Sequence, residues 1–220
     1  RLDGLHHDIL ERLGGFEVRP DQLRPLLWLG RDRCRFADFF AAEMPMATSG
    51  LATEACVAPI QYRDDGTLGR TIDRLKAATA KLAPGRVFMT AVAPASTAYN
   101  GVNEYYASDH DYVFAIAEAL RKEYLAIHEA GLLLQVDDAV LANMYDELVQ
   151  KSPERYREWA ELRVDALNHA LRGIPPERVR FHTCYSINMG PRVHDMELRD
   201  IVDLVLEIDA GAYSFEAANP

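Results

Sequence analysis

A regular alternation of short apolar segments and amphipathic helices runs from about residue 51 to the end of the chain, and it restricts the possible folds more than any other feature. Each apolar segment is bounded by turn residues, which is typical of a strand. Strands that alternate with helices imply right-handed βαβ units and a parallel sheet. The expected strands are residues 54–62, 86–94, 132–140, 178–186 and 212–218, and the expected helices lie within residues 68–85, 108–131, 152–173 and 201–208.

Two of these helices carry clear signals at their ends. Ser108, with Asp111 three residues later, forms a capping-box-like start, and Gly131 ends the same helix. Ser152 followed by Pro153 is the preferred order of a cap and a proline at the first helical position. The helix that begins after Ser108 has an apolar stripe at helical spacing, which predicts a core-facing side: Val113, Ile116, Ala117, Leu120, Tyr124 and Ile127.

Five strands in series, with inner strands that are almost continuously apolar, suit either a doubly wound sheet or a (β/α)8 barrel. No glycine-rich dinucleotide loop follows any of them, which argues against a Rossmann fold. A complete barrel needs eight strands in roughly 250 residues, whereas this chain of 220 residues shows only five. The sequence therefore predicts an α/β fold, a (β/α)8 TIM-type barrel that is incomplete in this chain, with its last strands cut off or not included.

The first 50 residues do not follow the alternation. Residues 10–16 and 34–44 are predicted to be helical, and the proline-containing stretch between them is predicted to be a loop. The chain is therefore divided into residues 1–50, an N-terminal helical and loop region that could be an insertion of the barrel, and residues 51–220, the partial barrel.

Composition argues against several classes of function. The formal net charge is -10 and Lys and Arg do not cluster, which disfavours nucleic-acid binding. No run approaches the ~18 apolar residues of a membrane span, and no secretory signal is visible. The three cysteines, Cys34, Cys56 and Cys184, are odd in number and widely spaced, which is typical of a reducing compartment. We expect a cytoplasmic protein with no nucleic-acid or membrane partner, and the oligomeric state stays open.

A histidine and a cysteine lie two residues apart near the end of the fourth expected strand. His182 and Cys184 therefore project from the same side of that strand, at the end where a barrel carries its catalytic residues. The fifth strand ends in Glu216. Imidazole, thiolate and carboxylate are all Zn2+ ligands, so these three residues are candidate metal ligands. The alternative is a buried cysteine, a hydrogen-bonded histidine and a solvated glutamate.

Acidic and amide side chains near two other strand ends are candidate substrate contacts. Adjacent carboxylates are costly to bury together unless a cation binds them, so Asp137 is a candidate for a pocket, whereas Asp138 is as well explained as a cap for the following segment. Asn103 and Glu104 follow the second strand and could line the mouth of the barrel, since βα loops carry function there. The remaining histidines have no partner at ligand spacing, and a surface or packing role is expected for His6, His7, His110, His128, His169 and His194.

Three segments together resemble a known family. The stretches NEYYASDHDYVFAIAEALRKEYLAIHEAGLLLQVDD, ALNHALRGIPPERVRFHTCYS and AYSFEAANP are similar to the cobalamin-independent methionine synthases, in their short single-barrel branch that is like the C-terminal domain of those enzymes, over roughly residues 85–220. The resemblance implies that His182, Cys184 and Glu216 bind Zn2+ together with a later cysteine. It also implies that Asp137 contacts the amino group of the thiol substrate. This chain reads Asp-Asp-Ala from Asp137 onward, where those enzymes usually read Asp-Glu-Pro.

The activity implied by the resemblance is a zinc-dependent transfer of a methyl or other alkyl group to a zinc-activated thiol, with a homocysteine-type acceptor and a folate-type or other donor. His182, Cys184 and Glu216 would be the catalytic residues, and Asp137, Asn103 and Glu104 the substrate contacts. The alternatives are an epoxide:thiol transferase of the same barrel family, a metal-free uroporphyrinogen decarboxylase-like barrel and a non-catalytic binding module. We expect the natural chain to continue past Pro220 for roughly 100 residues and to supply the later cysteine.

Overall fold

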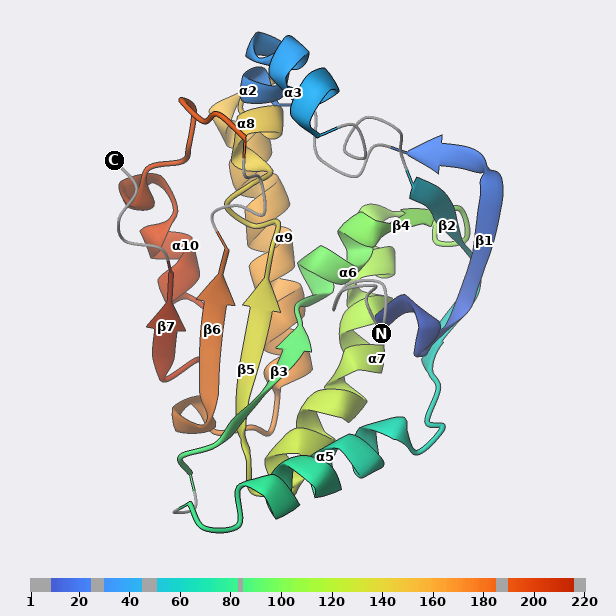
Figure 1. The fold of residues 1–220 in the computed structure, drawn as a ribbon, viewed down its shortest axis with the longest axis vertical. Helices are drawn as coiled ribbons and strands as arrows, with labels where there is room; N and C mark the ends of the chain where they lie inside the picture. The colour runs from blue at the N-terminus through green and yellow to red at the C-terminus, as the bar shows by residue number, and fades with distance from the viewer. Residues whose placement is uncertain (1–8, 25–29, 45–50, 83–84, 185–189, 216–220) are drawn as a thin grey trace.

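The computed structural model of the protein describes residues 9–24, 30–44, 51–82, 85–184 and 190–215. Within these ranges the chain forms a three-stranded sheet and a four-stranded sheet (Figure 1). The strands are β1 (Leu13–Arg24), β2 (Leu51–Tyr62), β3 (Phe88–Val92), β4 (Gly101–Asn103), β5 (Leu133–Asp138), β6 (Val179–Thr183) and β7 (Ala212–Ser214). The α-helices are α2 (Arg31–Arg35), α3 (Ala37–Glu43), α5 (Thr67–Ala78), α6 (Pro94–Asn100), α7 (Asp109–Glu129), α8 (Tyr145–Leu148), α9 (Pro153–Leu171) and α10 (Val202–Leu206).

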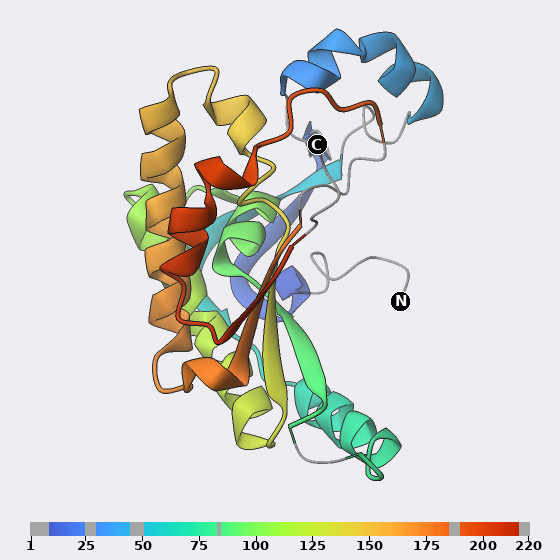
Figure 2. The same ribbon diagram turned by 90° about the vertical axis from the view of Figure 1, so that its left-hand side faces the viewer.

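The four-stranded sheet, in the order β3-β5-β6-β7, is parallel throughout. Its strands are the last four of the five predicted strands, so the prediction of a parallel sheet is confirmed for them. Helices α7 and α9 cover one face of this sheet in both views (Figures 1 and 2). On the covered face Leu134, Val136 and Phe181 are at most 1% exposed. They belong to the same buried cluster as the predicted stripe of α7, which is confirmed: Val113, Ile116, Ala117, Leu120, Tyr124 and Ile127.

The first predicted strand, β2, lies in the other sheet. It pairs in antiparallel fashion with β1 and in parallel fashion with β4, in the order β1-β2-β4. Strand β1 belongs to the N-terminal 50 residues and β2 to the rest, so the two regions share a sheet along the length of β2. The division at residue 50 stays a prediction.

The prediction of a helix over residues 10–16 is wrong, and so is that of a loop after it as far as Arg24; Pro25, in the same predicted loop, lies outside the described residues. Only residues 9–11 are helical, and a strand begins at Leu13. Gly15 has a φ of 95°, and a Cβ there would lie 2.6 Å from the carbonyl oxygen of Ala58. This positive φ falls where the β1–β2 register shifts, which identifies a β-bulge that suits glycine. Pro20 lies in the second register shift of β1, a place where a strand tolerates proline.

The helix caps predicted at Ser108 and Ser152 are confirmed. The hydroxyl oxygen of Ser108 accepts a hydrogen bond from the Asp111 N–H at 3.0 Å, and that of Ser152 accepts one from the Arg155 N–H at 3.1 Å. Of residues 34–44, which are predicted to be helical, 34–35 lie in α2 and 37–43 in α3, with Phe36 between the two helices. The sequence did not predict α6, which begins at Pro94 immediately after β3, or the short strand β4 that follows it.

The two sheets are not closed into a barrel within the described ranges. What the structure establishes is a mixed α/β fold, with a parallel sheet backed by helices on one face and a three-stranded mixed sheet beside it (Figure 1). Across the described residues, no helix combines the length and apolar character that a membrane crossing needs.

Candidate functional site

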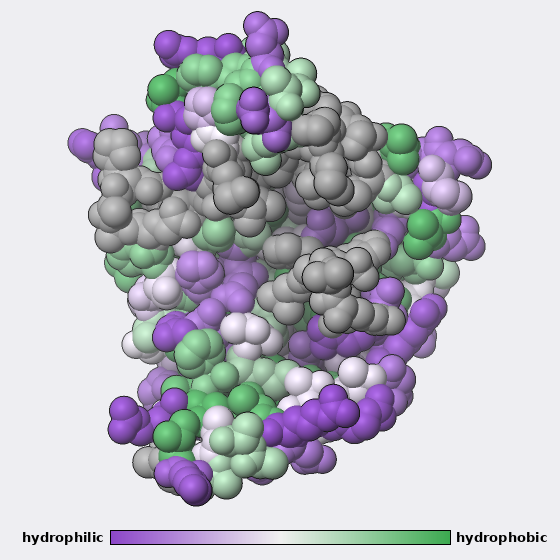
Figure 3. All heavy atoms as spheres, viewed as in Figure 1, coloured by the Kyte–Doolittle hydropathy of each residue, from purple (hydrophilic) through white to green (hydrophobic). Residues whose placement is uncertain are grey.

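The candidate site lies at the carboxyl ends of β5, β6 and β7. Asp137 of β5 is the ladder partner of His182 of β6, and His182 is the partner of Ser214 of β7. These three residues therefore form one row across the sheet. Thr183, on the helix-covered face, is 1% exposed, whereas Asp137 and His182 are half-buried on the opposite face. Figure 3 shows hydrophilic side chains gathered over the upper part of β5 and β6 on that face.

The orientation of the His182 ring is set by the backbone of β7. Its Nδ1 atom lies 3.1 Å from the carbonyl oxygen of Ser214 and 3.3 Å from the Ser214 hydroxyl. A carbonyl oxygen only accepts, so Nδ1 carries the hydrogen and donates to it. The lone pair of the neutral imidazole is then on Nε2. Metal-binding histidines commonly show this arrangement, in which one nitrogen donates to a carbonyl and the other binds the ion.

Cys184 lies one residue past the end of β6 and is half-buried. Its N–H donates to the carbonyl oxygen of Asp138 at 2.9 Å, and its carbonyl oxygen accepts a hydrogen bond from the Asn143 amide at 3.2 Å. The same Asn143 nitrogen donates to the Ala139 carbonyl oxygen at 2.6 Å. The main chain at Cys184 is thus held on both sides, by the last residue of β5 and by Asn143 in the segment after it. Sequence reasoning did not identify Asn143, because its partner is 41 residues away along the chain.

The third candidate ligand, Glu216, lies outside the described residues. Within the described ranges, no group of three His, Cys, Asp or Glu side chains could hold a metal ion. The prediction that His182, Cys184 and Glu216 converge on one ion therefore stays a prediction. The alternative for His182 is a histidine that is only hydrogen-bonded, and the Ser214 carbonyl oxygen supplies such a partner.

The two adjacent aspartates at the end of β5 have opposite environments. Asp138 is 3% exposed, and its Oδ1 atom accepts hydrogen bonds from the N–H groups of Val140 and Leu141, both at 2.9 Å. The Ser96 hydroxyl donates to the same oxygen at 3.2 Å. The interpretation of Asp138 as a cap is confirmed. Asp137 faces the other way and accepts a hydrogen bond from the side-chain amide of Gln135 at 2.6 Å.

Asn103 and Glu104 lie at the end of β4, in the other sheet. The side-chain Oδ1 atom of Asn103 accepts from the Tyr106 N–H at 2.9 Å, and its Nδ2 donates to the Tyr106 carbonyl oxygen at 2.9 Å, which stabilises a tight turn. Glu104 forms a bidentate ion pair with Arg19 of β1, at 2.7 and 2.6 Å. These contacts join Asn103 to its own turn and Glu104 to β1, and the role of both residues in substrate binding stays a prediction.

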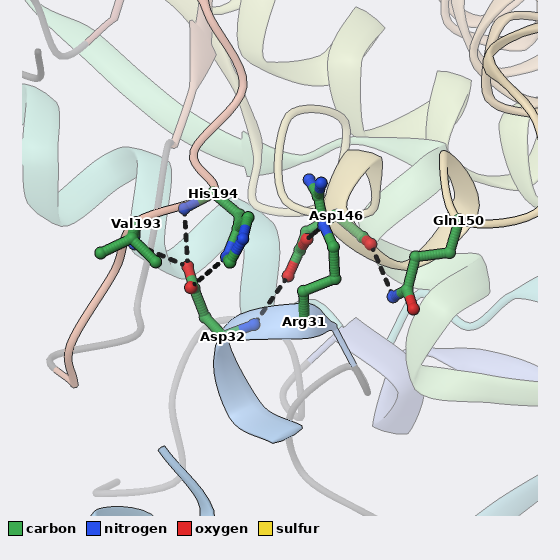
Figure 4. Close-up of polar contacts among 6 residues, drawn as sticks. All are labelled: Arg31, Asp32, Asp146, Gln150, Val193 and His194. Carbon is green, nitrogen blue, oxygen red and sulfur yellow. Dashed lines mark hydrogen bonds and ion pairs between the residues drawn. The ribbon is translucent and has the colours of Figure 1, made fainter. Parts of the chain in front are cut away.

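An acid–histidine pair near the same end of the molecule was not predicted. The Oδ1 atom of Asp32, in α2, lies 2.6 Å from Nδ1 of His194, and its Oδ2 accepts from the N–H groups of Val193 and His194 at 3.0 and 3.1 Å (Figure 4). Burial by itself raises the pKa of Asp32, but the hydrogen bonds from His194 and Val193 outweigh it, so this pKa is below its ordinary value. The sequence carried no signal for this pair, because the two residues are 162 positions apart.

A second carboxylate extends the same contact. Asp146, in α8, accepts from Arg31 Nε at 2.6 Å and from the Asp32 N–H at 3.3 Å (Figure 4). A Cβ on Gly30 would lie 2.1 Å from the Asp146 carboxylate, so only glycine allows this approach. Helix α2 is thereby attached both to α8 and to the segment that follows β6.

The chain is similar to known proteins in sequence and in fold. No family model matches the chain. It is 25% identical over 170 residues to a methionine synthase of Saccharolobus solfataricus, an alignment that covers 77% of this chain and 45% of that protein. In fold it is similar to a B12-independent methionine synthase from Shewanella sp. W3-18-1, solved in complex with selenomethionine, with a TM-score of 0.52, 17% identity, and coverage of 81% of this chain and 42% of that one. The chain thus spans less than half the length of these relatives, and it is similar to one methionine synthase in sequence and to another in fold.

Proposed function

We propose that this chain forms the metal- and thiol-binding part of a methionine synthase-like thiol S-methyltransferase. The observation that carries the proposal is the row of Asp137, His182 and Ser214, because it places a carboxylate beside an imidazole whose Nδ1 donates to a carbonyl oxygen. The similarity to a methionine synthase over 170 residues supports the same class of reaction.

The fold proposed for the intact protein is a (β/α)8 barrel of which this chain supplies a part. Four consecutive parallel strands with helices on one face are what an arc of such a barrel contains. The face away from the helices is polar, with Gln135 buried and Asp137, Arg180 and His182 half-buried. A polar row of this kind fits the inner wall of a barrel near its catalytic mouth.

Two of the described residues have the chemistry of zinc ligands. A neutral imidazole with its lone pair on Nε2 and a half-buried cysteine one residue past the strand end are both suitable Zn2+ donors. In the proposal His182 and Cys184 hold the ion together with Glu216. Zn2+ bound there would lower the pKa of a substrate thiol so that it is present as the thiolate.

Other residues of the chain would bind and orient the acceptor. Asp137 lies beside His182 on the same face, so its carboxylate would accept hydrogen bonds from the ammonium group of a homocysteine-type thiol. The ladder hydrogen bonds of β5 and β6 hold the two side chains at a set separation, which orients the acceptor before reaction. The methyl donor, folate-type or other, would approach from the open side of the row.

The test is methyl transfer by the full-length natural protein. The protein would be incubated with homocysteine and a methylated folate, and methionine would be measured by mass spectrometry before chelation, after chelation and after return of Zn2+. We expect methionine formation that is lost on chelation and restored by zinc. A product formed only when an epoxide replaces the methyl donor would indicate an epoxide:thiol transferase. Purified protein without zinc would indicate a metal-free decarboxylase-like barrel or a binding module.

A further inference from the structure

A chain of hydrogen bonds runs along the open face of the sheet toward Asp137. Arg180 of β6 and Gln135 of β5 are ladder partners, two residues before His182 and Asp137 on their respective strands. Arg180 Nε donates to Oε1 of Gln135, and Gln135 Nε2 donates to Oδ1 of Asp137 at 2.6 Å. The guanidinium carbon of Arg180 lies 3.9 Å from the centre of the Phe88 ring on β3.

The polarity of this chain of hydrogen bonds is determined by its two ends. A guanidinium group can only donate and a carboxylate can only accept, so the Gln135 amide has one orientation that satisfies both. Gln135 is 9% exposed, so water competes little for these bonds. Phe88 and the cation–π contact hold the Arg180 end in place. Gln135 thus holds the carboxylate of Asp137 and is itself held by Arg180.

We propose that Gln135 and Arg180 are positioning residues that hold the Asp137 carboxylate in the orientation that receives the ammonium group of an amino-thiol acceptor. This inference rests on the function proposed above. An aspartate side chain on a strand can adopt several rotamers. If one rotamer is fixed before the acceptor binds, the entropic cost of binding is lower. The two residues would then determine the preference for thiols that carry an amino group over thiols that do not.

The alternative role for this chain of hydrogen bonds is purely structural, as a link between β5 and β6. The two roles differ in what a loss of the Gln135 donor does to different thiols. A structural link, once lost, would weaken the site for every acceptor. A positioning role affects only the acceptor whose ammonium group meets Asp137.

The first experiment compares two thiols in the full-length, zinc-containing protein. The probes are homocysteine and 4-mercaptobutyrate, the same thiol acid without the amino group, with Kd from calorimetry and KM and kcat from turnover. Gln135→Met keeps the shape of the side chain and removes the donor. We expect it to weaken the binding of homocysteine about tenfold to a hundredfold. The binding of 4-mercaptobutyrate and the zinc content should be unchanged. Gln61→Met, at an exposed position of β2, is the matched control and should change neither thiol.

Equal losses for both thiols, or no loss for either, would overturn the positioning role while leaving the proposed function intact. A wild-type protein that binds neither thiol would instead overturn the proposed function. A second experiment, which needs no substrate, tests the contact between Gln135 and Asp137.

The second experiment places two carboxylates in the contact. Gln135→Glu still accepts from Arg180 but sets a second acid against Asp137, and two acids that share a hydrogen bond raise the pKa of one of them. A group whose pKa is raised in the folded state contributes to stability at low pH, and this contribution is lost as the pH rises. The Tm difference from wild type should therefore widen between pH 5 and pH 8, whereas Gln61→Glu should show a constant difference. A constant difference in Gln135→Glu as well would show that Gln135 does not hold Asp137.

Discussion

The Nδ1 atom of His182 lies 3.1 Å from the carbonyl oxygen of Ser214 on the neighbouring strand. The acceptor is a main-chain atom, so the contact does not depend on the side chain at position 214. It turns the ring so that Nε2 is the nitrogen with the lone pair. The backbone pairing of β6 and β7 thus prepares one donor of the proposed zinc site.

This relationship predicts different effects for a substitution at position 182 and one at position 214. An asparagine amide can occupy the place of Nδ1 and keep the bond to Ser214, whereas it offers nothing in the place of Nε2. We expect His182→Asn in the full-length protein to retain its Tm within a few degrees and to lose most of its zinc. Ser214→Ala should keep both properties, because the carbonyl oxygen remains. Zinc retained in His182→Asn would exclude Nε2 as a ligand.

The cysteines allow a matched test of the second donor. Cys184 is half-buried two residues after His182, whereas Cys34 is exposed in α2. Cys184→Ser should lose most of the bound metal in elemental analysis, since a serine hydroxyl is a poor zinc ligand at neutral pH. Cys34→Ser should bind as much zinc as the wild type. Equal zinc contents in the two variants would contradict the assignment of Cys184.

The buried aspartate at the end of β5 should matter for stability. Asp138 accepts two main-chain hydrogen bonds and one from Ser96 while 3% exposed. Asp138→Ala leaves these donors buried without their acceptor, which costs about 1–3 kcal/mol for such a group. Urea unfolding should show a free energy of unfolding that is lower than that of the wild type by about this amount. An unchanged midpoint would mean that water replaces the carboxylate.

Its neighbour should matter for substrate instead. Asp137→Asn keeps an oxygen that can accept from Gln135, so little change in the free energy of unfolding is expected. The lost charge should raise the KM for homocysteine by one to two orders of magnitude, on the order of 1.5–3 kcal/mol for a charge-assisted hydrogen bond. Steady-state kinetics with homocysteine and 4-mercaptobutyrate would measure this. If wild-type protein uses both thiols equally well, Asp137 has another role.

The Asp32–His194 contact predicts a pH-dependent contribution to stability. The pKa of Asp32 is lowered in the folded protein. Its contribution is therefore fully present above the unfolded value, about 3.9, and is lost as the pH falls through the lower folded value. Asp32→Asn should reduce the free energy of unfolding by about 1–3 kcal/mol at pH 7, and by progressively less below about pH 4.

The control for that experiment is Asp38→Asn, an exposed aspartate in α3, which should leave the free energy of unfolding unchanged at every pH. A difference between Asp32→Asn and wild type that stays constant from pH 7 to pH 3 would contradict the role assigned to the Asp32 carboxylate.

The sequence by itself determined the features that depend on near neighbours along the chain. The caps at Ser108 and Ser152 and the Asp138 turn each join groups two or three residues apart, so the pattern of residue types was sufficient. The apolar stripe of α7 and four strands of the parallel sheet followed from periodicity in the same way. Periodicity also placed His182 on the open face of its strand.

Only the tertiary structure decided the contacts that join distant segments. The pairing of β1 with β2 turned a predicted helix into a strand, because a register of main-chain hydrogen bonds and a bulge at Gly15 outweighed local helix preference. The Ser214 carbonyl beside His182 and the Asp32 carboxylate beside His194 join residues 32 and 162 positions apart. Such partners are selected by the packing of the whole chain, since nothing in the spacing of residues along the sequence determines which distant group reaches a given side chain.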